Sequence, residues 1–181
     1  MNFTYVDNSN VYAEGCRASA VAKKMAGAGT YVDAMNNGVV DRDWNLDYGH
    51  LHQFVCGDKE DIGAAKLWGS PPPSDSFWAM VARKGFEVKT FEKNFSGKEK
   101  KVDVAIAHQI TKDAYSGKIR KGLDEITLVA GDKDFCPVVE DLVQEGYVVH
   151  VVFWDNAAPE LRAICSKFTS LNPFLNFVTR P

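Results

Sequence analysis

Four aspartates could bring carboxylates from distant parts of the sequence into one site: Asp7, Asp103, Asp132 and Asp134. Asp7 and Asp132 each follow a short apolar run that predicts a β-strand, and Asp103 falls in the first turn of a predicted helix. Asp132 and Asp134 are two residues apart, so in an extended segment their side chains point the same way. The dipole of the predicted helix favours the ionised form of Asp103. The pattern predicts one acidic site built from three segments.

Carboxylates that lie close together repel one another, and a bound cation relieves that repulsion. Ligation by oxygen alone suits Mg²⁺ or Mn²⁺ and not zinc. Such ions activate a water molecule and stabilise charge on a phosphoryl group, so the chemistry indicated is phosphodiester hydrolysis. Each aspartate taken singly also fits a cap or a turn, and Asp134 could cap the helix that contains Pro137. The conjunction of three segments favours the shared metal site.

Short apolar runs alternate with helical patterns, which predicts a parallel sheet with crossover helices. The runs are Phe3–Val6, Ala64–Trp68, Phe86–Phe91, Ile126–Ala130 and Val148–Trp154, with a short final run at Phe177-Val178. Helices are expected at about 14–26, 47–55, 75–84, 101–116, 136–145 and 158–166. The stretch 27–46 is expected to be a long surface loop. Right-handed crossovers would place the strand ends along one edge of the sheet, where ligands bind in such folds.

The bulk composition predicts one compact domain over residues 1–181. Hydrophobic residues make up 45% of the chain and charged residues 25%, as in ordinary globular proteins. No apolar run is long enough for a transmembrane helix, and the first residues lack the features of a signal peptide. The four scattered cysteines are interpreted as reduced thiols in a cytoplasmic protein. The net charge of −3 argues against a protein that coats nucleic acid without regard to sequence.

Three motifs in this order resemble the NYN domain, a branch of the PIN-like nucleases. They are Tyr5-Val6-Asp7-Asn8-Ser9-Asn10, Lys98-Glu99-Lys100-Lys101-Val102-Asp103-Val104-Ala105-Ile106-Ala107 and Val129-Ala130-Gly131-Asp132-Lys133-Asp134-Phe135-Cys136-Pro137. The apolar strand after Glu145 and the segment Pro159-Glu160-Leu161-Arg162 also resemble its C-terminal part. The similarity therefore spans Asn2 to about Leu171.

The resemblance implies a PIN-like three-layer α/β sandwich whose central, mainly parallel sheet is flanked by helices. It implies a Mg²⁺- or Mn²⁺-dependent ribonuclease, an endonuclease, whose catalytic and metal-binding acids are Asp7, Asp103, Asp132 and Asp134. Asn10 would be a polar pocket residue that orients a ligand or a substrate phosphate. The expected partner is RNA that is single-stranded or structured with accessible loops. The sequence leaves open whether the chain forms a homodimer.

The sequence departs from the family pattern at two positions. Members often carry an aspartate six residues after the position of Asp103, where this chain has Gln109, and another before the Lys167-Phe168 pair, where it has Ser166. Gln109 lies about 9 Å further along the predicted helix than Asp103, so it would contact substrate or a second ion. Asp113 lies about 15 Å along, too far to share an ion with Asp103.

Basic and aromatic residues supply further candidates for contact with RNA. Lys100 and Lys101 lead into the motif of Asp103 and are expected to contact the phosphate backbone, although a solvated helix start is an equally good interpretation. Four aromatic residues near predicted loops could stack on unpaired bases, although packing is the commoner role for such residues. They are Tyr12, Trp44, Tyr48 and Trp68.

Two other functions stay open. The first is a catalytically weakened RNA-binding or protein-interaction module of the same fold, which Gln109 favours. The second is a haloacid-dehalogenase-like phosphatase, a class that also places an aspartate after its first strand. That class requires a second aspartate two residues later, and Ser9 occupies that position.

Overall fold

The computed structural model describes residues 1–70, 74–91 and 102–181. Within them, the strands form one parallel sheet in the order β3-β2-β1-β4-β5-β6. The strands are β1 (Asn2–Asp7), β2 (Ile62–Gly69), β3 (Glu87–Thr90), β4 (Glu125–Val129), β5 (Val148–Phe153) and β6 (Lys167–Ser170). Because β1 lies between β2 and β4, the chain reverses its direction of travel across the sheet at β1, and ligands bind at such a point in parallel folds.

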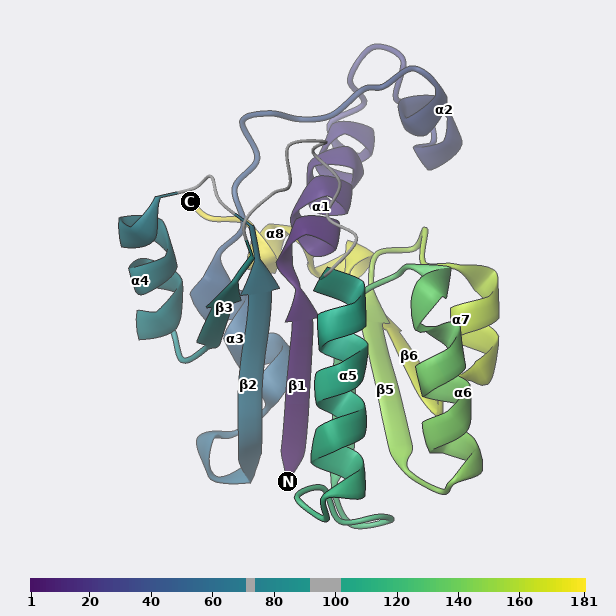
Figure 1. Cartoon of the computed structure of the whole chain (residues 1–181). Helices are drawn as coiled ribbons and strands as arrows, with labels where there is room; N and C mark the ends of the chain where they lie inside the picture. The colour runs from purple at the N-terminus through teal and green to yellow at the C-terminus, as the bar shows by residue number, and fades with distance from the viewer. Residues whose placement is uncertain (71–73, 92–101) are drawn as a thin grey trace.

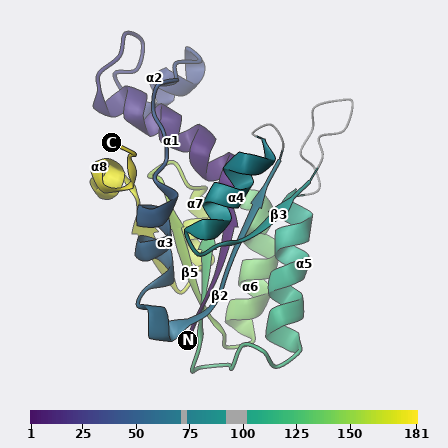
Figure 2. The same ribbon diagram turned by 90° about the vertical axis from the view of Figure 1, so that its left-hand side faces the viewer.

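Helices cover both faces of the sheet, which gives three layers (Figures 1 and 2). The longer helices are α1 (Asn8–Ala22), α3 (Tyr48–Cys56), α4 (Asp75–Arg83), α5 (Val102–Tyr115) and α6 (Cys136–Gln144). The shorter ones are α2 (Tyr31–Asn36), α7 (Pro159–Ile164) and α8 (Leu175–Val178). No helix in the described part of the chain has the length and apolar character that crossing a membrane would need.

Two hydrophobic cores lie on opposite faces of the sheet. On one face, α5, α6 and α7 pack over Tyr5 and Leu128. On the other, α1, α3 and α4 pack over Val6 and Val129, the next residues of the same strands. Neighbouring residues of a strand point to opposite faces, so the central strands are apolar on both sides. This explains why they occur in the sequence as continuous apolar runs.

The structure corrects three expectations about secondary structure. Helix α1 begins at Asn8 rather than near residue 14, because Asp7 caps it by accepting the backbone N–H of Asn10 at 3.1 Å. The stretch 27–46 is not only a surface loop, since it contains α2 and the buried residue Trp44. Phe177-Val178 is not a strand but belongs to α8, whose Val178 packs into the core.

The strand that the sequence does not predict is β6, with the sequence Lys-Phe-Thr-Ser. It pairs with β5 at the edge of the sheet. Its residues are only partly buried or exposed, so it lacks the apolar run that marks a central strand.

Candidate metal centre

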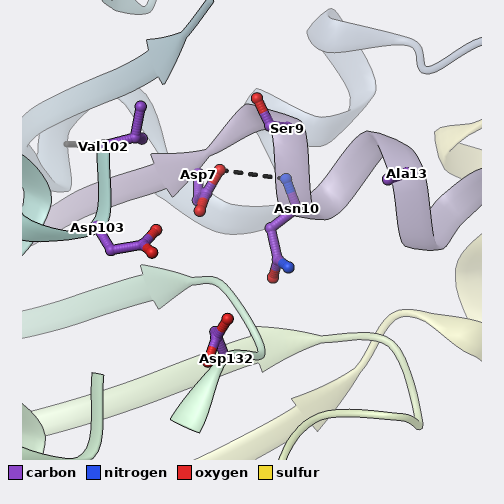
Figure 3. Close-up of a pocket in the computed structure, with 7 residues that line it drawn as sticks. All are labelled: Asp7, Ser9, Asn10, Ala13, Val102, Asp103 and Asp132. Carbon is purple, nitrogen blue, oxygen red and sulfur yellow. Dashed lines mark hydrogen bonds between the residues drawn. The ribbon is translucent and has the colours of Figure 1, made fainter. Parts of the chain in front are cut away.

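A pocket of about 300 Å³ lies at the end of β1, where the chain enters α1. Its lining comes from the start of α1, the start of α5 and the segment after β4 (Figure 3). The lining residues are Asp7, Ser9, Asn10, Ala13, Val102, Asp103 and Asp132. Three of the four predicted acids therefore share one pocket.

Three acids place their carboxylates close enough to share an ion. One carboxylate oxygen from each of Asp103, Asp132 and Asp134 lies within 4.8 Å of the other two. Asp103 and Asp132 are partly buried, whereas Asp134 is exposed. A set of carboxylate oxygens fits a hard divalent cation such as Mg²⁺ or Mn²⁺. The residues present are therefore compatible with the metal that the sequence implies.

Asp7 and Asp134 occupy different parts of this centre. Asp7 is buried at the end of β1 and lines the pocket, but it does not belong to the group of three acids. Asp134 belongs to that group but does not line the pocket. In Figure 3, Asp7, Asp103 and Asp132 approach the pocket from separate elements.

The segment after β4 is held by a local cap. Asp132 accepts the backbone N–H of Asp134 at 3.0 Å and caps the short 3₁₀ helix η2 (Lys133–Phe135). The alternative role of Asp134 as the cap of the helix containing Pro137 is wrong, because Phe135 occupies the N-cap of α6 and no side chain caps it. Asp132 therefore combines a capping bond with a place in the acid group.

The other predicted contact residues lie in different surroundings. Asn10 lines the pocket, and its Oδ1 accepts the backbone N–H of Gly131 at 2.9 Å. Gln109 lies outside the pocket lining; its Oε1 accepts from Lys89 at 3.0 Å and its Nε2 donates to Asp113 at 3.1 Å. A contact between Gln109 and substrate stays a prediction.

The predicted contacts of Lys100 and Lys101 with the phosphate backbone lie outside the described residues. Among the aromatic candidates, Trp44, Tyr48 and Trp68 are buried in the core, so the suggestion that they stack on bases is wrong. Tyr12 is 36% exposed and donates to the carbonyl of Trp44.

Sequence reasoning missed a buried ion pair between Lys66 of β2 and Asp113 of α5, whose Nζ and Oδ2 atoms are 2.6 Å apart. Tyr5 also donates its hydroxyl to Asp113 Oδ2 at 2.8 Å. Burial alone would raise the pKa of Asp113, but hydrogen bonds from Lys66 and Tyr5 outweigh it and lower the pKa. Burial, with the bond to Asp113, raises the pKa of Tyr5. These groups anchor α5, the helix that carries Asp103.

A signal for this pair was present in the sequence. Lys66 interrupts the apolar run of β2, and Asp113 continues the spacing of the apolar residues Val102, Ile106 and Ile110 on α5. A charged residue at a core position requires a partner, and two such residues on neighbouring elements are candidates to pair.

Comparison with known proteins agrees with this fold. A solved structure of a protein of unknown function from Vibrio parahaemolyticus superposes with a TM-score of 0.68 at 18% identity, covering 99% of this chain and 96% of that chain. At this identity the likeness concerns the fold alone. No curated protein matches the chain significantly. Residues 5–172 match the NYN domain model, which spans both the acid-bearing segments and the sheet. The chain therefore belongs to the NYN domain family, within the PIN-like nuclease superfamily.

Proposed function

We propose that the chain is a Mg²⁺- or Mn²⁺-dependent ribonuclease that cuts phosphodiester bonds within RNA at the pocket between β1, α5 and β4. The proposal rests on the proximity of three carboxylates: one oxygen from each of Asp103, Asp132 and Asp134 lies within 4.8 Å of the other two. Membership of a nuclease superfamily supports the same chemistry. That membership lends no support to the phosphatase alternative.

Asp103, Asp132 and Asp134 would hold the ion, and Asp7 would complete the acidic wall of the pocket. When bound, the divalent ion supplies Lewis acidity toward the phosphate and a more acidic water. The hydrogen bond from the N–H of Asn10 holds one oxygen of Asp7 in place. Asp103 lies in the first turn of α5, at the positive end of the helix dipole.

The acids should also make RNA binding depend on the divalent ion. Without a cation, neighbouring carboxylates repel a phosphodiester, and the net charge of −3 adds no attraction from the rest of the chain. RNA would therefore bind productively only with the divalent ion. Attraction must come from local contacts, among which Lys100 and Lys101 remain candidates. We propose single-stranded RNA, or accessible loops of structured RNA, as the substrate.

The test is cleavage of a 5′-labelled single-stranded RNA by the purified chain with Mn²⁺, compared with Asp132→Asn. Asparagine keeps an oxygen that can accept the N–H of Asp134, so this change removes charge while sparing the cap. We expect cleavage to fall by at least ~10-fold, because a ligand should matter no less than outer-shell partners do. Excess EDTA should abolish cleavage by the unchanged chain.

The matched control is Asp58→Asn. Asp58 is an exposed aspartate just before η1 (Lys59–Asp61) and β2. It therefore lies near the N-terminal end of a strand, whereas the pocket lies at the C-terminal end of β1. It should cleave at the rate of the unchanged chain. Equal cleavage by the unchanged chain and Asp132→Asn would reject the proposed site. RNA binding without metal-dependent cleavage would instead support the non-catalytic RNA-binding module.

A further inference from the structure

Asn10 joins two of the segments that carry the acids. It lies in the first turn of α1, and its backbone N–H donates to Asp7 Oδ1 at 3.1 Å. Its side-chain Oδ1 accepts the backbone N–H of Gly131 at 2.9 Å, and Gly131 directly precedes Asp132. Figure 3 shows the Asn10 side chain reaching from α1 toward the segment of Asp132. One residue thus bridges the end of β1 and the segment after β4.

The peptide groups of Gly131 are held from several sides. Its carbonyl accepts the N–H of Ala158, the N-cap of α7, at 2.9 Å. A Cβ on Gly131 would lie only 2.1 Å from Cδ1 of Phe153, so β5 packs directly against it. With its N–H bound to Asn10, Gly131 is fixed between α1, α7 and β5. The place of Asp132, the next residue, depends on these contacts.

We propose that Asn10 is a positioning residue of the metal centre, acting on Asp132 through Gly131, rather than a contact for the substrate. This inference rests on the proposed function. Partners that orient a metal ligand typically contribute 10- to 100-fold to metal affinity, although they do not touch the ion. Removing the Asn10 acceptor leaves the N–H of Gly131 unpaired in a buried place, which favours a shift of the acid-bearing segment.

The test measures Mn²⁺ binding to the protein alone, from the electron paramagnetic resonance signal of free Mn²⁺. Asn10→Ala should raise the Kd for Mn²⁺ by about 10-fold or more. Its KM for RNA at saturating Mn²⁺ should stay unchanged. Asn10→Asp keeps an oxygen that can accept the N–H of Gly131, so it should bind Mn²⁺ at least as tightly as the unchanged chain.

Asn172→Ala is the matched control. Asn172 Oδ1 accepts the backbone N–H of Asp155 at 2.8 Å, a bond of the same kind in the segment after β5. It lies outside the group of three acids and the pocket lining, so its loss should leave Mn²⁺ affinity unchanged. An Asn10→Ala protein with unchanged Mn²⁺ affinity and a raised KM would overturn the inference and make Asn10 a substrate contact.

Hydrogen exchange of the Gly131 amide keeps the inference testable if Asn10→Ala does not fold. In the unchanged chain and in Asn10→Asp, this amide should be protected from exchange; rapid exchange in the unchanged chain would overturn the inference. The two proposals fail separately. If Asp132→Asn abolishes cleavage while Asn10→Ala binds Mn²⁺ normally, only the positioning role is lost. If Asn10→Ala weakens Mn²⁺ binding but the unchanged chain cuts no RNA, only the ribonuclease is lost.

Discussion

Asp113 is an acid in the core whose oxygens are surrounded by donors. Only 5% of the residue is exposed, and it accepts hydrogen bonds from Lys66, Tyr5 and Gln109. Two charges buried together gain from their attraction about what they lose in hydration, so such a pair adds little net stability compared with apolar residues. Removing one partner is different, because it leaves an uncompensated charge in the core.

Lys66→Met should therefore destabilise the protein by about 3–5 kcal/mol, and so should Asp113→Asn. The double variant should lose less than the sum of the two, because neither charge then remains unpaired. Urea unfolding gives all three values. Lys118→Met is the control, since Lys118 approaches the same carboxylate at 3.8 Å but its side chain is 45% exposed. It should cost at most about 1 kcal/mol.

The pair also gives stability a pH dependence. Because the folded protein lowers the pKa of Asp113, its contribution is complete above the ordinary carboxyl pKa and is lost as pH falls through the lowered value. Lys66→Met removes a bond that lowers this pKa, so the Asp113 carboxylate should lose less stability than in the unchanged chain as the pH falls. The difference in the free energy of unfolding between the unchanged chain and Lys66→Met should therefore shrink below the ordinary carboxyl pKa. Additive losses in the double variant, or a difference that does not change with pH, would contradict the pairing.

At this scale the sequence predicts the acids better than their neighbours. Asp7, Asp103 and Asp132 were predictable as pocket residues because strand ends and a helix start fix where they lie. The bond from Gly131 to Asn10 and the pair of Lys66 with Asp113 were not, because each joins residues whose separation depends on how the elements pack. A single sequence carries no direct measure of that packing.

Among the elements, α1 packs tightly against two tryptophans at Gly15. A Cβ there would lie 2.4 Å from Cη2 of Trp44 and 2.9 Å from Cζ2 of Trp154. The two indole rings meet edge to face, with their centroids 6.0 Å apart. Trp154 also donates its Nε1–H to the carbonyl of Val11 in the same helix. The absence of a side chain at residue 15 is therefore what lets α1 lie against the tryptophans.

Gly15→Ala should destabilise the protein by about 1–3 kcal/mol, the usual cost of overpacking a core. Helix propensity alone predicts the opposite, a gain of roughly 0.5–1 kcal/mol. Urea unfolding distinguishes the two predictions: overpacking lowers the urea concentration at the midpoint of unfolding, and helix propensity raises it. Gly49→Ala in α3 is the control, because its Cβ would lie 3.2 Å from Asp47 Oδ1, an atom of a side chain rather than a packed ring. A stabilised Gly15→Ala protein would mean that α1 shifts away from Trp44 at little cost.

The elements themselves were predictable where their faces are apolar. Strands β1, β2, β4 and β5 were expected because both of their faces are covered by helices. The edge strand β6 was missed because its four residues are polar or only partly buried. The last residues were expected as a strand, yet Leu175 and Val178 are three apart and place one apolar face of α8 against the core. A run of two apolar residues cannot distinguish the two-residue period of a strand from the 3.6-residue period of a helix.

At the scale of the whole molecule, two proteins that share few identical residues can have the same fold. The Vibrio parahaemolyticus protein has the same fold at 18% identity over nearly the full length of both chains. A sheet covered on both faces requires apolar strands and amphipathic helices in the right order, and many sequences meet that requirement. The acidic centre requires particular residues at particular ends. The fold was therefore predictable from pattern, and the site from specific residues.

If the proposed metal centre is correct, metal binding should be linked to the stability of the whole fold. Asp103 stands at the start of α5, whereas Asp132 and Asp134 follow β4, so unfolding separates the proposed ligands. An ion that binds the folded chain alone stabilises it by about 2.7 kcal/mol at a concentration 100 times its Kd. Mn²⁺ should therefore raise the Tm in thermal unfolding, and Asp103→Asn should remove most of that rise. Asp58→Asn, with the same change of charge on the exposed surface, should keep it. If Mn²⁺ raised the Tm of Asp103→Asn as much as that of the unchanged chain, the ion would bind elsewhere. The carboxylates that the fold brings together would then not be its ligands.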